Sequence, residues 1–122
     1  MITTFRSLEV YQESIKLAIE IEILIRGFPK FEQFLIVDQM RRASRTIPAL
    51  IAEGYAKRAS IKTFQKYLND AVGEANEMIS HLEITDKLGY IKKNGYGEEL
   101  IRRYDILGKK MSNLKNNWQN FK

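Results

Sequence analysis

Seven large apolar residues near the end of the chain recur at alternating spacings of four and three. They are Leu100, Tyr104, Leu107, Met111, Leu114, Trp118 and Phe121. These spacings keep the side chains on one side of an α-helix, and seven positions without a break form a coiled-coil-like seam. No useful stretch of the chain alternates with the period of two that a half-buried strand shows. The pattern therefore predicts an all-α fold in which this helix buries one edge.

Three further helical segments account for most of the remaining chain. We expect them from about Leu8 to Arg26, from near Pro29 through residues 39–60, and from Ser60 to Leu88. Ser7 and Ser60 are the predicted N-caps, and Gly89 is the predicted C-terminal glycine of the third helix. Short connections favour antiparallel neighbours. The sequence therefore predicts one domain, residues 1–122, built as an antiparallel up-down-up-down four-helix bundle. The predicted inward stripe of the third helix is Ile61, Phe64, Leu68, Ala71, Ala75, Met78, Ile79 and Leu82.

The second helix contains a proline in its middle. Pro48 has no N–H to donate to the carbonyl of Ser44, and its ring crowds that carbonyl, so we expect a kink there. The surrounding stretch carries five cations and a single acid, Glu53. If the kink bends the chain back toward a shared pocket, Arg42 and Glu53 can meet. We therefore expect a partly buried charged network, formed by Arg42, Glu53, and Glu74 or Glu77.

The first helix is apolar around roughly twice the arc of about 100° that a helix in a monomeric bundle needs. Its polar residues fall on one narrow wedge: Glu9, Gln12, Glu13, Lys16 and Glu20. We therefore expect this helix to pack on two sides, the second being another subunit. Gly73 lies in the middle of the third helix, opposite its apolar stripe, where glycine costs about 1 kcal/mol relative to alanine. Close approach of another backbone would explain it and would also indicate a second packing face.

Charge is segregated along the chain. The net charge is +5, but residues 39–66 and 87–122 each carry +6, whereas residues 67–86 carry −5. A basic face can attract nucleic acid, and it can equally meet the acidic face of another subunit. The candidate nucleic-acid-binding residues are Arg41, Arg45, Lys57, Arg58, Arg102, Arg103, Lys109 and Lys110. Because the nearby aromatics Tyr104 and Trp118 belong to the seam, we expect contacts to phosphates with little reading of sequence.

The residues needed for most enzyme and metal chemistry are missing from the sequence. There is no cysteine, and His81, preceded by Glu77 one turn earlier, is the single histidine. A di-iron bundle needs paired Glu-x-x-His motifs, and no Gly-rich phosphate loop occurs. We therefore expect no enzymatic activity, no cofactor and no metal. Asp70, Glu74 and Glu77 are interpreted as partners for arginines rather than as an acid–base cluster.

Neither a secretion signal nor a membrane span is visible. The segment MITTFRSLEV lacks a basic stretch followed by an apolar run. The most apolar stretch, LAIEIEILI, contains two glutamates and is too short to span a bilayer. We therefore expect a cytoplasmic protein without a membrane partner.

Several short motifs, taken together, carry a resemblance. They are Phe5 with Leu8, Phe28 with Pro29, Gln39 with Arg42 and Ala43, TIPALIAEG at 46–54, Gly73 with Glu74 and Glu77, and LGYI at 88–91. Over residues 5 to 115 the chain resembles the small four-helix bundle proteins encoded by intervening sequences within bacterial 23S ribosomal RNA genes. Thr46, Leu50 and Glu74 replace the Ser, Asn and Ser that are usual in that family. The Asn-to-Leu difference puts a polar role at position 50 in question.

The resemblance has implications for assembly and function. A related bundle is the accessory protein of diversity-generating retroelements, a basic pentameric barrel that binds nucleic acid and a reverse transcriptase. By resemblance, this chain is expected to form a homo-oligomer, a pentamer, without enzymatic activity. Two functional hypotheses follow. One is an accessory module that binds RNA or DNA through the eight cations, and the alternative is a protein–protein interaction scaffold.

Overall fold

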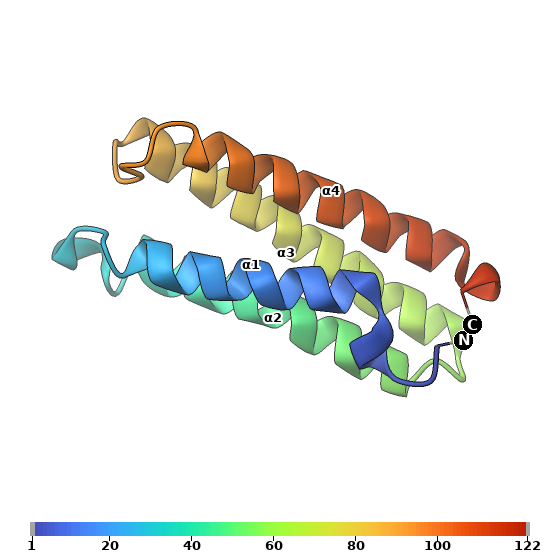
Figure 1. The fold of residues 1–122 in the computed structure, drawn as a ribbon. Coiled ribbons are helices and arrows are strands. Elements are labelled where there is room, and N and C mark those ends of the chain that lie inside the picture. Colours follow the sequence, from blue (N-terminus) through green and yellow to red (C-terminus); the bar gives the residue numbers. More distant parts are fainter. Residues whose placement is uncertain (1, 122) are drawn as a thin grey trace.

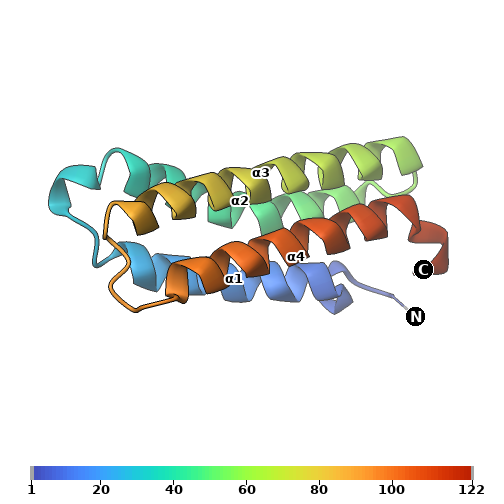
Figure 2. The same cartoon turned by 90° about the horizontal axis from the view of Figure 1, so that it is seen from above.

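The computed structural model describes residues 2–121, so the two terminal residues of the predicted domain lie outside it. Its helices are α1 (Glu9–Ile25), α2 (Ile36–Ala56), α3 (Ile61–Lys87) and α4 (Tyr96–Asn116), with short 3-10 segments η1 (Phe5–Ser7), η2 (Lys30–Glu32) and η3 (Trp118–Asn120). Residues 2–121 contain no strand. Consecutive helices run in opposite directions, and both ends of the chain lie at the same end of the molecule (Figures 1 and 2). The predicted all-α, up-down-up-down four-helix bundle is confirmed.

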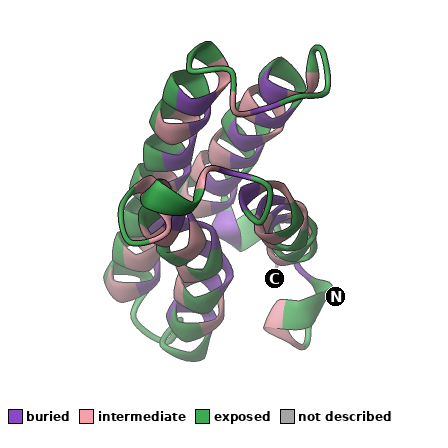
Figure 3. Ribbon diagram, turned by 90° about the vertical axis from the view of Figure 1, so that its left-hand side faces the viewer, coloured by how far each residue is buried: buried purple, intermediate pink, exposed green. Residues whose placement is uncertain are grey.

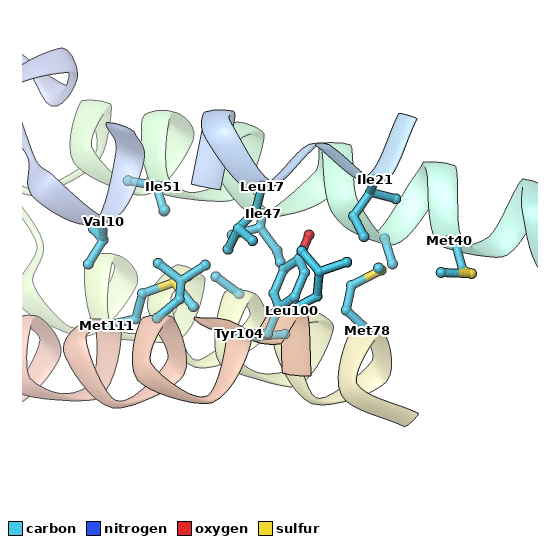
Figure 4. Close-up of a cluster of buried hydrophobic side chains, with 14 of the residues drawn as sticks. Val10, Leu17, Ile21, Met40, Ile47, Ile51, Met78, Leu100, Tyr104 and Met111 are labelled. Atoms are coloured by element: carbon cyan, nitrogen blue, oxygen red, sulfur yellow. The ribbon is translucent and has the colours of Figure 1, made fainter. Parts of the chain in front are cut away.

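The predicted seam of α4 forms much of the core. The buried residues of the four helices face the space between them, and their outer surfaces are exposed (Figure 3). Figure 4 shows Leu100, Tyr104 and Met111 among apolar residues of the other three helices. Trp118 is also buried, and its ring packs edge-on against Phe64 at 5.0 Å between centroids. The seam ends there. The helix stops at Asn116, so the predicted last position, Phe121, is exposed.

The ends of α3 follow the sequence closely. The hydroxyl of Ser60 accepts a hydrogen bond from the N–H of Thr63, which satisfies one of the free donors of the first turn. At the other end, Gly89 has a φ of +79°, and the N–H of Tyr90 reaches back to the carbonyl of Thr85. This is a Schellman C-cap, which favours glycine at the left-handed position. Both predicted end signals are confirmed, although Ile61 at the start of the predicted stripe is exposed.

The starts of the first two helices differ from the prediction. Ser7 belongs to η1, and Leu8, whose side chain cannot cap, precedes α1. Pro29 precedes η2 rather than α2, which begins only at Ile36. Leu35 has a ψ of −112°, outside the helical range, and it separates the two segments. The connection between α1 and α2 is therefore longer and more irregular than predicted.

The helix α2 continues through Pro48. Hydrogen-bonded helix runs from Ile36 to Ala56 with the proline buried inside it. The hydroxyls of Ser44 and Thr46 donate to the carbonyls of Arg41 and Arg42, respectively. Hydroxyl bonds of this kind often accompany bends in helices. The kink itself stays a prediction.

Near its C-terminal end, α2 crosses α3 at very short range. A Cβ built on Gly54 would lie 2.6 Å from the Cβ of Tyr67 and 3.2 Å from a ring carbon of Phe64. No side chain fits at position 54 without moving one helix away from the other. Gly73 is different, because nothing in the described chain lies within 4 Å of its built Cβ. The backbone approach predicted at Gly73 is thus not made within one chain.

Helix α1 buries only one of its two apolar sides. Val10, Leu17, Ile21 and Ile25 point into the core. The opposite side carries Ile15, Ile19 and Ile23, which are 38%, 59% and 64% exposed. Of the four adjacent helix pairs, α1 and α4 make the least contact. The wide apolar arc predicted for the first helix therefore leaves an isoleucine stripe at the surface of the single chain.

Candidate nucleic-acid interface

Glu22 on α1 lies at the centre of a cluster of three arginines. Its carboxylate accepts hydrogen bonds from Nε of Arg41 at 2.9 Å, Nη2 of Arg45 at 3.0 Å and Nε of Arg26 at 3.2 Å. Arg41 and Arg45 are one turn apart on α2, so both guanidinium groups reach the same point on α1. The structure thus brings two of the candidate cations together. Their partner, Glu22, is not among the site residues predicted from the sequence.

The arginines control the protonation of Glu22. Hydrogen bonding from Arg41, with support from Arg26 and Arg45, lowers the pKa of Glu22 to about 2 although desolvation acts in the opposite direction. Glu22 in turn raises the pKa of Arg41, so both groups are charged at neutral pH. One signal in the sequence could have found this cluster. The first helix is rich in acids, the second is rich in arginines, and antiparallel neighbours place them side by side.

The two candidate cations that follow α2 are held in different ways. Nζ of Lys57 donates to Glu53 at 3.1 Å and to the hydroxyl of Tyr67 at 2.7 Å, and that hydroxyl donates to Glu53 at 2.8 Å. The guanidinium of Arg58 lies over the ring of Tyr55, 4.0 Å from its centre, and Nη1 donates to the carbonyl of Tyr55. Lys57 is therefore tied to a carboxylate. Arg58 makes a cation–π contact and remains exposed.

Two of the four candidate cations of α4 face α1. Nη1 of Arg103 lies 2.7 Å from Oε2 of Glu20. The other carboxylate oxygen, Oε1, accepts a hydrogen bond from the hydroxyl of Tyr96. About two turns farther along α4, Lys110 forms an ion pair with Glu9. Both pairs bridge the loosely packed boundary between α1 and α4. Acids of the first helix, rather than those of residues 67–86, thus neutralise these cations.

The other two cations of α4 point away from the bundle. Lys109 pairs with Asp105 on its own helix at 3.0 Å, and its side chain is largely exposed. Arg102 is exposed and has no carboxylate partner within residues 2–121. The four cations therefore do not form one continuous face. Arg102 and Lys109 are accessible, whereas Arg103 and Lys110 stabilise the contact with α1.

The network predicted from Arg42, Glu53, and Glu74 or Glu77 is not formed within the chain. Arg42 pairs instead with Asp38 one turn earlier, at 3.1 Å, and its side chain is exposed. The positions of Arg42 and Glu53 are separated by eleven residues of one continuous helix, a rise of about 16 Å. That distance keeps the two side chains apart. Local pairs one turn away replace the expected network.

In the described part of the chain, the acids of α3 are also paired locally or have no cation partner. Asp70 pairs with Lys66 at 3.0 Å, and Glu77 lies 3.2 Å from Nε2 of His81. Burial, and then the charges of Glu77 and Asp70, raise the pKa of Glu74. Within residues 2–121, no three His, Cys, Asp or Glu side chains gather as a metal site would require. None of the helices described there is both long and apolar enough to cross a membrane.

The isoleucine stripe lies between two rows of ion pairs. Glu22 and its arginines border the stripe on the α2 side, and Glu20 with Arg103 borders it on the α4 side. In the pairs made by Glu9, Glu20 and Glu22, five cations share three carboxylates. We call the stripe Ile15, Ile19 and Ile23 together with these flanking pairs the α1 face. It combines exposed apolar area with an excess of positive charge.

Comparison with known proteins identifies the family. The sequence model of the 23S rRNA-intervening sequence protein family matches residues 6–113, which span α1, α2, α3 and most of α4. The chain belongs to this family. No curated protein sequence matches it.

Two of the motifs that carry the resemblance to the 23S rRNA-intervening sequence proteins have structural roles. The TIPALIAEG block forms the second half of α2, where Ile47, Ile51 and Gly54 are buried. In the LGYI block, Gly89 ends α3 and Ile91 is buried. These residues serve helix packing and chain reversal.

Proposed function

We propose that this 23S rRNA-intervening sequence protein is a non-enzymatic, RNA-associated accessory protein that acts in the cytoplasm as a homo-oligomer. The observation that carries the proposal is the α1 face, where exposed isoleucines lie between two rows of ion pairs in which cations outnumber carboxylates. The family name supplies the connection with RNA. The cations supply the means of contact, because phosphate groups dominate the affinity of proteins for nucleic acids.

Assembly and RNA binding support each other in this proposal. Burying Ile19 and Ile23 against a second copy removes apolar area from water, worth about 25 cal/mol per Å². The same contact brings the flanking cations of neighbouring copies close together. Each copy contributes a net charge of +5, so the field of an assembly exceeds that of one chain. The resemblance described above implies a pentamer.

RNA binding of this kind is expected to be weak and indifferent to sequence. The contacts come from Arg41, Arg45, Lys57, Arg58, Arg102, Arg103, Lys109 and Lys110. Most of these cations already have a carboxylate partner, so a phosphate must share or replace it. Such contacts position a nucleic acid without reading its bases. Affinity should therefore depend steeply on salt and little on sequence.

The test is a salt titration of binding to a structured RNA hairpin. The logarithm of affinity should fall against the logarithm of salt with a slope of about −0.7 to −0.9 per phosphate contacted. Changing Arg102 and Lys109 together to glutamine should weaken binding to all sequences and reduce the slope by about one per lost contact. These two are preferred because neither bridges two helices. The matched control also removes two charges: Lys62 and Lys87, exposed lysines outside the candidate set, are changed together to glutamine.

Two outcomes would contradict the proposal. One is the absence of binding at about 50 mM salt, where phosphate contacts are strong. The other is an equal loss of affinity in the control variant, which would show only a dependence on net charge. If the protein does not bind RNA at all, the hypothesis that remains is a protein–protein interaction scaffold.

A further inference from the structure

A hollow of about 620 Å³ opens where the end of α1 meets the start of α2. Its lining includes three cations, Arg26, Lys30 and Arg41, together with Asp38 and the ring of Phe34. Binding sites for small molecules and cofactors span about 300 to 1,000 Å³. The hollow is therefore large enough for a nucleotide, and it offers both positive charge and an aromatic surface.

Phe34 is the most exposed large apolar residue described. Its side chain is 93% exposed, and that of Phe31, three residues earlier, is 70% exposed. Both lie in the irregular connection between α1 and α2, seen at the left end of the molecule in Figure 1. Phe34 is one of the residues that line the hollow, whereas Phe31 is not. An exposed aromatic ring beside cations is a surface on which a base can stack.

Glu22 holds two of the three cations of the hollow, Arg26 and Arg41, in position. Glu22 binds Arg26 through Nε alone, and it binds Arg41 through Nε and Nη2. The Nη1 group of Arg41 and both Nη groups of Arg26 have no protein acceptor within residues 2–121. Lys30 has no carboxylate partner in the same range. N–H donors thus remain available for a phosphate while the guanidinium groups are already ordered.

Asp38 is the one acid that lines the hollow, and its effect is limited. Its carboxylate already pairs with Arg42 at 3.1 Å. It also lies in the first turn of α2, whose N-terminus has no side-chain cap and carries partial positive charge. The three lining cations therefore outweigh it, and the hollow favours an anion.

We propose that this hollow binds an unpaired nucleotide of RNA. The base stacks on Phe34, and its phosphate contacts Arg26, Lys30 and Arg41. An anionic ligand with an aromatic ring satisfies the cations and the exposed ring together. This inference rests on the proposed RNA-binding function and adds to it a preference for single strands, because bases in a duplex are already stacked and paired. It also supplies the aromatic contact that Tyr104 and Trp118, buried in the seam, cannot make.

The experiment compares a labelled single-stranded oligouridylate with an RNA duplex of equal length, measured by fluorescence anisotropy. Phe34→Ala should weaken binding of the single strand about tenfold, as expected when one base loses its stacking partner. Duplex affinity should stay unchanged. The exposed position of Phe34 means that the variant keeps its fold. Phe31→Ala removes an equivalent ring from the same connection, but outside the hollow, and should leave both affinities unchanged.

Lys30→Gln provides a second test that does not depend on the ring. It should weaken single-strand binding and reduce the salt slope by about one. Equal effects of Phe34→Ala and Phe31→Ala would overturn the inference, as would a loss that is the same for single strand and duplex. A change of oligomer mass in Phe34→Ala would also overturn it, because the ring would then contact a second copy. If the parent protein binds neither RNA, the proposed function fails together with this inference.

Discussion

At the scale of single residues, pairing decides which charges remain available for binding. Glu22 takes three arginines, and Glu20 and Glu9 each take a cation from α4. Arg102 and Arg58 remain exposed and have no carboxylate partner among residues 2–121. Charged residues that look alike in the sequence therefore differ in function, because some stabilise helix contacts while others face solvent.

The acid stability of the protein should depend on Glu22. Its pKa in the folded protein is about 2, below the value of about 4.3 for an unfolded glutamate. A carboxyl whose pKa is lowered by folding stabilises the protein fully at a pH above its unfolded pKa. This contribution is lost as the pH falls through the window from about 4.3 to about 2. Glu22→Gln should therefore reduce the free energy of unfolding by about 1–2 kcal/mol at neutral pH. The variant should also lose less stability than the parent as the pH falls through the window.

Urea unfolding at neutral pH and at several points in the window measures both effects. Glu13→Gln is the matched control, because Glu13 is on the same helix but pairs only with the exposed Lys16. Exposed pairs of this kind contribute about 0–1 kcal/mol. Identical pH profiles for Glu22→Gln and the parent would show that the cluster does not contribute to stability.

At the scale of elements, two helical glycines lie in different surroundings, one in a tight helix contact and one beside open space. Gly54 lies where α2 and α3 touch, and Gly73 lies in mid-α3 with open space beside it. Both cost helix propensity relative to alanine. Contacts among the described residues explain the glycine only at position 54, where the short distance to Tyr67 leaves no room for a side chain.

Alanine at these two positions should have opposite effects. Gly54→Ala places a Cβ 2.6 Å from the Cβ of Tyr67, so the helices must separate and stability should fall by about 1–3 kcal/mol. Gly73→Ala should stabilise the single chain by about 0.5–1 kcal/mol, because it meets nothing and removes the cost of glycine. Urea unfolding measures both changes. A parent-like stability for Gly54→Ala would contradict the close crossing.

At the scale of the whole molecule, the bundle leaves an apolar stripe on α1 that none of the helices described in residues 2–121 covers. Ile15, Ile19 and Ile23 lie on the side of α1 that points away from the core. The rows of ion pairs on either side hold the neighbouring helices in place. The α1 face is therefore a defined surface and not a gap in packing, and we expect a second copy to cover it.

Ile19→Asp should separate the assembly into single chains without unfolding them. Ile19 is more than half exposed in the single chain, so the change costs little within it but buries a charge in the proposed interface. Light scattering at micromolar protein gives the mass, and circular dichroism checks the helices. Ile84→Asp, an exposed isoleucine of α3 outside the α1 face, should keep the parent mass. A parent protein that is already monomeric would remove the basis for the interface.

Structural features that depend only on residues close together in the chain could be predicted from the sequence. The seam of α4, the cap at Ser60 and the glycine at the end of α3 all depend on neighbours along the chain. The sequence did not predict features that no nearby residue determines. The irregular connection before Ile36 has no capping side chain to mark the start of α2, and the partners of Arg41 and Arg45 lie on another helix.

By itself, the sequence determined four antiparallel helices, one strongly apolar first helix and membership of a family, because helical periodicity and shared motifs are properties of the linear chain. Only the tertiary structure decided that Glu22 receives the arginines of α2, and that Glu53 accepts a hydrogen bond from Tyr67 of α3. It likewise decided that Phe34 lies beside three cations. Such pairings depend on how far each helix is rotated about its own axis and on how the helices cross. Those angles are set by the packing of all four helices together.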